Sequence, residues 1–120
     1  MAAAGTLDHF LTLLHKSRLL TEAAFAAART QVRGVQATTA EQAADALVAQ
    51  GVLTKYQANR LLEGRRRGLF IDDYKIIELL GCGGMGYLYR AQELKTDWEV
   101  ALKVLADRFR FDKGRLTRYQ

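Results

Sequence analysis

The sequence predicts an α+β fold, in which a helical N-terminal part precedes a three-stranded antiparallel sheet. Within residues 6–67, apolar residues recur at helical spacing in four stretches, and a threonine that can cap a helix stands before each one. Residues 74–105 differ, because they contain three short runs with the alternation or the β-branched and aromatic content of strands. Glycines separate the first two of these runs, and a polar loop separates the last two.

Composition and charge are those of a small globular protein. The chain has 120 residues, of which 49% are hydrophobic and 26% charged, and its formal net charge is +5. No apolar run is long enough to span a membrane, and the N-terminus lacks the features of a secretory signal. We therefore expect a cytoplasmic chain, although a longer form could carry an anchor beyond residue 120. The single cysteine, Cys82, cannot form an internal disulfide, and no zinc-binding cluster or other metal site is expected.

The four expected helices cover residues 6–17, 21–33, 38–50 and 54–67. Gly34 and Gly51 stand where glycines commonly end helices. Thr54 and Gln57 have the spacing of a capping box, in which each side chain bonds the other residue's backbone N–H. Arg67 and its neighbours would place cations at the negative end of the fourth helix.

A faint internal repeat runs through these helices. Residues 14–21 (LHKSRLLT) and 47–54 (LVAQGVLT) are 33 residues apart, and each reads as helix, short turn, Leu-Thr and helix again. Two such hairpins would pack as a small four-helix bundle. Residues 1–67 contain no paired carboxylates, no nucleophile beside a base and no glycine loop, which leaves a protein-interaction or regulatory role as their expected function.

The glycines of residues 81–86 are the main chemical signal. Gly81, Gly83 and Gly86 have G-x-G-x-x-G spacing, and Gly84 is an additional glycine. Such loops let a backbone approach phosphate groups, because no Cβ stands in the way. A dinucleotide-binding loop would open into a helix, but the run that follows, residues 87–91, has the pattern of a strand. A P-loop is excluded as well, because no Gly-Lys-Ser/Thr triplet exists.

With a lysine inside the third strand, these glycines resemble the start of a protein kinase catalytic domain. The glycine loop continues with Leu88 where the family usually has Val, and residues 100–103 (VALK) match the family's V-A-I-K strand. The GGMG of residues 83–86 is similar to bacterial serine/threonine kinases in particular. Residues 51–62 also resemble a small helical domain that precedes the kinase domain in some planctomycete kinases.

The resemblance implies an ATP site in a truncated kinase N-lobe. Backbone amides of residues 83–86 would cover the phosphates, Lys103 would pair with the α- and β-phosphates, and apolar side chains would form a roof over adenine. The ATP-binding residues implied in this way are Leu80, Gly81, Gly83, Gly84, Met85, Gly86, Leu88, Ala101 and Lys103. The implied organisation is a helical interaction domain (1–67), a packed linker (68–73) and a truncated N-lobe (74–120).

The catalytic parts of the kinase family are absent from these 120 residues. No glutamate follows Lys103, and neither an H-R-D-x-x-x-x-N segment nor a D-F-G triplet occurs, so the αC glutamate, the catalytic base and the magnesium ligands are all missing. We therefore expect an ATP-binding portion of a serine/threonine kinase that is inactive alone, with no catalytic residues. Magnesium would bind only if the rest of a kinase were present.

Two other functions remain open at this point. The chain could be a non-enzymatic module whose helices bind a protein partner, with the sheet as a remnant. Alternatively, arginines at 65–67 and along the tail, 106–120, could bind nucleic acid or anionic surfaces, since residues 65–120 hold twelve basic and eight acidic side chains. Neither basic run is interleaved with stacking aromatics, which makes a nucleic-acid partner the weaker interpretation. The tail is expected to form a short basic helix, and Trp98 is expected to pack across the sheet.

Overall fold

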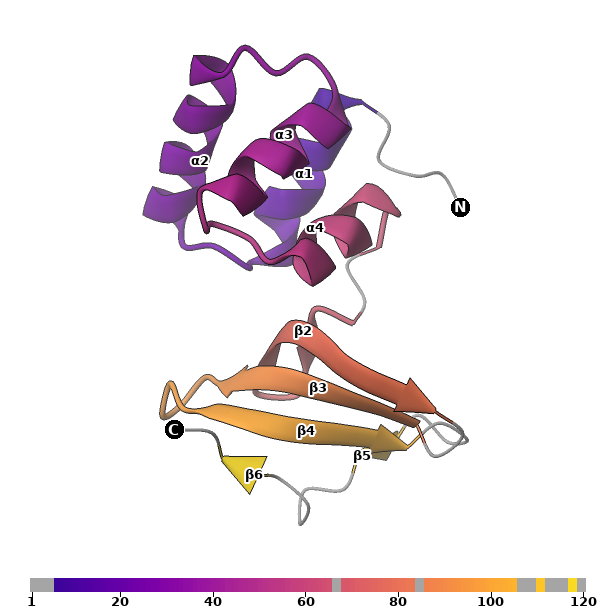
Figure 1. The fold of residues 1–120 in the computed structure, drawn as a ribbon. Helices are drawn as coiled ribbons and strands as arrows, with labels where there is room; N and C mark the ends of the chain where they lie inside the picture. The colour runs from indigo at the N-terminus through magenta and orange to yellow at the C-terminus, as the bar shows by residue number, and fades with distance from the viewer. Residues whose placement is uncertain (1–5, 66–67, 84–85, 106–109, 112–116, 119–120) are drawn as a thin grey trace. The chain divides into compact units, whose positions relative to one another are not determined.

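The computed structural model describes residues 6–65, 68–83, 86–105, 110–111 and 117–118, and it divides into two compact units, Met1–Leu69 and Phe70–Gln120. The fold is α+β, as predicted: the first unit is helical, and the second is an antiparallel sheet (Figure 1). The division falls inside the stretch 68–73. Among the described residues, none of the helices has the length and apolar character needed to cross a bilayer.

Each helix of the first unit begins directly after a threonine. The helices are α1 (Leu7–Ser17), α2 (Glu22–Gly34), α3 (Ala40–Ala49) and α4 (Lys55–Leu62). The four capping hydroxyls, on Thr6, Thr21, Thr39 and Thr54, accept backbone N–H groups of the first turns at 3.1–3.2 Å. All four predicted caps are confirmed. The Thr54–Gln57 capping box is complete, because Gln57 Oε1 also accepts the N–H of Thr54 at 3.0 Å.

One predicted helix end is wrong, and at another the end is correct to within one residue but the left-handed residue differs. Gly34 lies within α2, and the left-handed residue after this helix is Gln36, with a φ of 57°. The last helix stops at Leu62 rather than near Arg67. Its end is set by Gly64, whose φ of 77° leaves the helical region, and the N–H of Arg65 then donates to the carbonyl of Arg60 at 3.0 Å.

The faint sequence repeat corresponds to a repeat of structure. Residues 33 apart have the same role at nearly every defining position of the two hairpins, α1–α2 and α3–α4. The helix caps coincide as Thr6 with Thr39 and Thr21 with Thr54, the left-handed turn residues as Arg18 with Gly51, and the buried residues as Phe10 with Ala43, Leu14 with Leu47, Phe25 with Ala58, and Ala28 with Leu61. Thr6 and Thr39, the two first caps, also form an antiparallel bridge with each other. The helical unit is therefore built from two equivalent hairpins.

The sheet of the second unit has three long strands and three short ones. The strands are β1 (Phe70–Ile71), β2 (Tyr74–Gly83), β3 (Gly86–Glu93), β4 (Glu99–Leu105), β5 (Arg110–Phe111) and β6 (Thr117–Arg118). Their order is β1-β2-β3-β4-β5, with β6 also paired to β4, and every pairing is antiparallel. The long strands confirm the three predicted runs.

The predicted strand count was nevertheless too low. Residues 70–71, expected as linker, pair with the start of β2 because Asp72 adopts a left-handed φ of 50° and closes a two-residue turn. The helix expected in the tail is also wrong, since the described tail residues form β5 and β6 against β4. Trp98 was predicted to pack across the sheet. In the structure it precedes β4, and half of its surface (50%) is exposed.

Two bulges in β2 decide which side chains share a face of the sheet. The pairing with β3 shifts once between Ile76 and Glu78 and again between Leu79 and Gly81. Because directly opposed residues place their side chains on the same side, Gly81, Leu88 and Lys103 form one row across three strands. We call the side of this row the lysine face. The opposite side, the core face, carries buried Ile76, Ala91 and Leu102.

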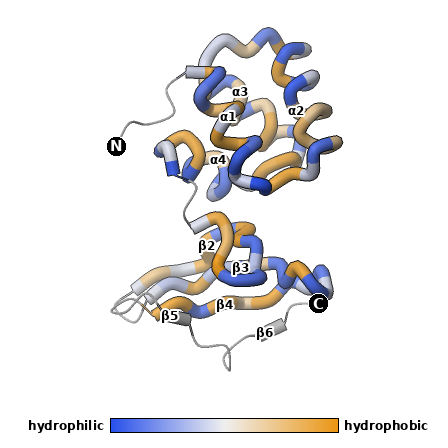
Figure 2. The backbone as a smooth tube through the Cα atoms, turned by 180° about the vertical axis from the view of Figure 1, so that it is seen from behind, coloured by the Kyte–Doolittle hydropathy of each residue, from blue (hydrophilic) through white to orange (hydrophobic). Residues whose placement is uncertain are grey.

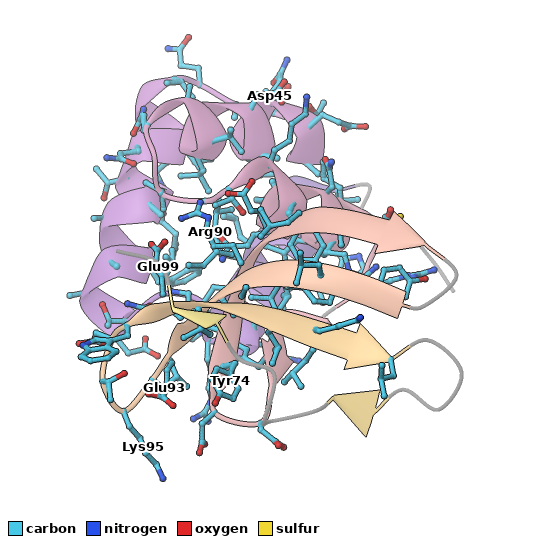
Figure 3. All side chains as sticks on the ribbon, turned by 60° about the horizontal axis from the view of Figure 1, so that its bottom comes forward. Asp45, Tyr74, Arg90, Glu93, Lys95 and Glu99 are labelled. Carbon is cyan, nitrogen blue, oxygen red and sulfur yellow. The ribbon has the colours of Figure 1, made fainter. Side chains whose placement is uncertain are left out.

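The polar pairs follow the same division. Arg90 and Glu99 are drawn on one side of the sheet, and Tyr74 and Glu93 on the other (Figure 3). β4 pairs with β3 on one side and with β5 and β6 on the other. It is apolar along much of its length (Figure 2), and Val100, Ala101, Leu102 and Val104 are all buried.

Replacing Arg18 with glycine is expected to stabilise the helical unit by about 0.5–1 kcal/mol. A residue with a Cβ in the left-handed region costs roughly 1–2 kcal/mol, and the greater freedom of glycine in the unfolded chain offsets part of that gain. Gly51→Ala is the matched opposite change, because Gly51 (φ 76°) has open space around it and only its conformation resists a side chain. Thermal unfolding followed by circular dichroism at 222 nm should move the two midpoints in opposite directions; a lower midpoint for Arg18→Gly would contradict this.

The sheet should lose stability at high pH through Tyr74. Burial, and then the Glu93 carboxylate, raise the pKa of Tyr74 above its usual 10.0. A raised folded-state pKa contributes stability that is present below the unfolded value and lost as the pH rises through the folded value. Urea unfolding between about pH 9 and pH 11 should therefore show a decline that Tyr74→Phe reduces.

Lys75 acts in the opposite sense, since burial lowers its pKa and that change raises stability as the pH rises toward the unfolded value. The free energies of unfolding of the parent chain and of Tyr74→Phe are therefore compared at each pH, because the contribution of Lys75 is present in both proteins. An identical pH dependence of the two proteins would refute the assignment to Tyr74.

Candidate functional site

An open hollow of about 320 Å³ lies beside the glycine loop. Its lining comes from all three long strands and consists of Gly81, Cys82, Gly86, Tyr87, Leu88 and Lys103. The row of Gly81, Leu88 and Lys103 crosses it from β2 to β4. The second bulge of β2 is what places Gly81 in this row.

Four of the residues implied by the kinase resemblance meet at this hollow: Gly81, Gly86, Leu88 and Lys103. Three others, Leu80, Gly83 and Ala101, are not part of its lining. Ala101 shares the lysine face but is only 7% exposed, whereas Leu80 and Leu88 expose 42% and 38%. Gly84 and Met85 lie outside the described residues.

The glycines of the loop are required by the fold to different degrees. A Cβ built on Gly81 or Gly83 would meet nothing within 4 Å, and neither residue has a positive φ. Gly86 is different, because it is buried and has a φ of 131°, which residues with a side chain rarely adopt. The fold thus explains one glycine and leaves open space at two, where a backbone without side chains could approach an anion.

Lys103 is half-buried and forms no ion pair with any residue in the described part of the chain. The two glutamates of the lysine face are held elsewhere. Arg90 donates from Nε to Glu78 Oε2 at 2.6 Å and from Nη1 to Glu99 Oε1 at 2.9 Å. The hydrogen bond with Glu99, followed by that with Glu78, raises the pKa of Arg90 against the opposing effect of burial. Because Arg90 occupies both carboxylates, the Lys103 ammonium remains able to bind an external anion.

The described residues around this hollow combine a half-buried lysine with exposed glycine backbone. A lysine beside exposed glycine backbone supplies a positive charge and N–H donors. Within the described ranges, no group of three or more His, Cys, Asp and Glu residues is placed to hold a metal ion.

Two lining residues were missed as site residues by the sequence reasoning. Cys82 was regarded only as a small loop residue, and Tyr87 only as part of a strand. The two are directly opposed across β2 and β3, and Tyr87 stacks on Tyr89 with ring centroids 6.2 Å apart. The G-x-G-x-x-G spacing alone could have indicated them, because it places positions 82 and 87 opposite each other in a hairpin closed by Gly83 and Gly86.

Comparisons with protein-family models, with curated proteins and with solved structures find no match for this chain. The kinase resemblance therefore stays a prediction from the sequence motifs of residues 74–105.

The three described loop glycines should respond differently to alanine. Gly81→Ala and Gly83→Ala are expected to change the free energy of unfolding by less than about 0.5 kcal/mol, since both sites have space and an ordinary φ. Gly86→Ala should cost more than about 1 kcal/mol because of its conformation and burial. Urea unfolding of the three variants would measure this. Equal losses at all three positions would mean that Gly81 and Gly83 are also needed for folding.

Proposed function

We propose that the sheet unit is the ATP-binding part of a protein-kinase-like fold, and that the chain alone binds ATP without transferring its phosphate. The observation that carries the proposal is the row of Gly81, Leu88 and Lys103 on one face of three antiparallel strands. A glycine hairpin and a lysine two strands away are the parts with which kinases hold ATP phosphates. The missing H-R-D and D-F-G segments are the reason to expect no phosphate transfer by these 120 residues.

The expected roles follow from the surroundings of each residue. Lys103 would pair with phosphate oxygens, and the backbone at Gly81 and Gly83 would approach them closely because no side chain intervenes. Leu80 and Leu88, both well exposed, would contact the adenine ring. Ala101 is covered by its neighbours, so adenine would reach it only after those side chains move. Magnesium would need ligands from other kinase segments.

A weak affinity is expected from the open shape of the site. Ligand sites usually enclose most of the ligand surface, whereas this hollow is open. The phosphates would be held largely by an exposed charge, which salt screens over about 8–10 Å. We therefore expect ATP to bind with a dissociation constant no lower than about 1 mM, equivalent to roughly −4 kcal/mol.

A second candidate function, a protein-interaction module, is favoured by a different observation. The helical unit is a bundle with its own core, in which Phe10, Leu14, Leu47 and Leu61 are fully buried. None of the described residues of this unit is among those that line the hollow beside the glycine loop. Such a bundle can serve a binding function that is separate from nucleotide binding.

Lys103→Met is the direct test of the proposed ATP site. Calorimetry at low ionic strength should detect weak ATP binding by the parent chain, and this variant should lower the affinity about tenfold, the size of one lost charge-assisted contact. Lys95→Met is the matched control, because Lys95 is 80% exposed and pairs with Asp73 in a turn rather than lining the hollow. Equal loss in both variants would indicate general charge attraction. Micromolar affinity would instead mean that further groups complete the site.

A further inference from the structure

Comparing the two equivalent hairpins separates the residues that a hairpin needs in order to fold from residues that can have another role. Their core and cap residues coincide, but the residues on the outer side of α1 and α2 do not. The differing pairs are His15 with Val48, Lys16 with Ala49, Arg18 with Gly51, Glu22 with Lys55, and Arg29 with Leu62. Since α3 and α4 form the same hairpin without the charged set, folding of a hairpin does not require it.

Arg18 gives the strongest sign that this set has another role. It adopts a φ of 63° at the position where the second hairpin has glycine with a φ of 76°. Arginine is the strained choice in this conformation, and glycine is the unstrained one. A strained residue at a position where glycine would fit is a reason to look for a role of its side chain. The side chain of Arg18 is exposed, so no packing contact in the core accounts for it.

Arg18 borders one of two hollows that flank His15, and we call the two together the α1–α2 groove. The first hollow, about 610 Å³, is lined by His15, Lys16, Arg18, Leu20, Thr21 and Glu22. The second, about 480 Å³, shares His15 and Lys16 and adds Leu11, Phe25 and Arg29 among its lining residues. Polar and apolar groups are therefore combined along the same groove.

The charges of the groove are arranged to leave its cations available. Glu22 is held by His15, whose Nε2 lies 3.0 Å from both carboxylate oxygens. His15 itself stacks on Phe25 with ring centroids 4.4 Å apart, and the Arg29 guanidinium lies 6.0 Å from the centre of the same ring. Lys16, Arg18 and Arg29 form no ion pair with any residue that the structure describes. The groove thus presents three cations around a fixed aromatic stack.

We propose that the α1–α2 groove binds an acidic segment of a partner protein, with carboxylates contacting Lys16, Arg18 and Arg29 and an apolar side chain between them. The apolar contacts would be Leu11, Leu20 and Phe25. A nucleic acid fits less well, because Asp8 and Glu22 also line the two hollows and would repel a polyanion. A peptide can place its carboxylates away from these two residues. This inference does not depend on ATP binding by the sheet unit.

Selection from a random twelve-residue peptide library on the immobilised full chain tests the proposal. The second hairpin supplies the variant for comparison: Lys16→Ala, Arg18→Gly and Arg29→Leu combined, which replaces each cation with the residue found 33 positions later. Enriched peptides should carry at least two Asp or Glu residues beside an apolar one. Fluorescence anisotropy should show that the triple variant binds them about tenfold or more weakly, the loss expected for three charge contacts.

A second triple variant controls for net charge. Arg33→Ala, Lys55→Ala and Arg65→Ala together remove the same three charges at exposed positions outside the groove, and this variant should lose less than about twofold in affinity. Circular dichroism of both variants should show unchanged helical content. Enrichment of basic or neutral peptides, no enrichment, or equal weakening by the two variants would overturn the proposal. So would tighter binding of a single-stranded oligonucleotide that only the groove variant abolishes.

Discussion

The register of β2 against β3 is the constraint on which the sheet unit and its site depend. Simple alternation from Ile76 would place Glu78 on the core face, where a carboxylate would be buried at high cost. The first bulge moves Glu78 to the lysine face, opposite Arg90. One bulge alone would then carry Gly81 to the core face. The second bulge reverses the shift and returns Gly81 to the row with Leu88 and Lys103.

The same register arranges the charges of the lysine face. Arg90, on the middle strand, reaches Glu78 on one neighbour and Glu99 on the other. These side chains are about one-third to two-fifths exposed, so solvent screens the pairs and their stability contribution is on the order of 1 kcal/mol at most. Their more important effect is on Lys103, because the two glutamates pair with Arg90 instead of with this lysine. With both glutamates bound to Arg90, Lys103 forms no ion pair with any residue in the described parts of the sheet.

Features set by local chemistry were the ones that could be predicted from the sequence. Threonines with helical patterns behind them gave the four helix starts, and Gly51 gave a helix end, because a cap depends on residues three or four positions apart. The end of α2 was predicted to within one residue, but the left-handed residue after it is Gln36 rather than Gly34. β1, β5 and β6 were missed because two-residue strands have no periodicity and exist only through pairing with long strands.

Some residues of the candidate site were predictable from the sequence, but its geometry was not. Spacing indicated the glycines and Lys103, and the structure brings Gly81, Gly86, Leu88 and Lys103 around one hollow. The bulges of β2 had no sign in the sequence that distinguishes them from regular alternation. The burial of Ala101, which is 7% exposed, could not be read from the VALK run either.

In both units, the residues that point to function are those that folding does not require. Gly81 and Gly83 occupy positions where an alanine has room, so their lack of a side chain serves no packing need. Arg18 has a left-handed backbone conformation, and the equivalent position of the second hairpin holds a glycine, Gly51, which adopts this conformation without strain. Gly86, by contrast, is accounted for by its own backbone, and it therefore carries less functional weight than its place in the motif suggests. For the helical unit, this comparison is possible within one chain because the hairpin occurs twice. A side chain that is present in one hairpin and absent from the other is not required for a hairpin to fold.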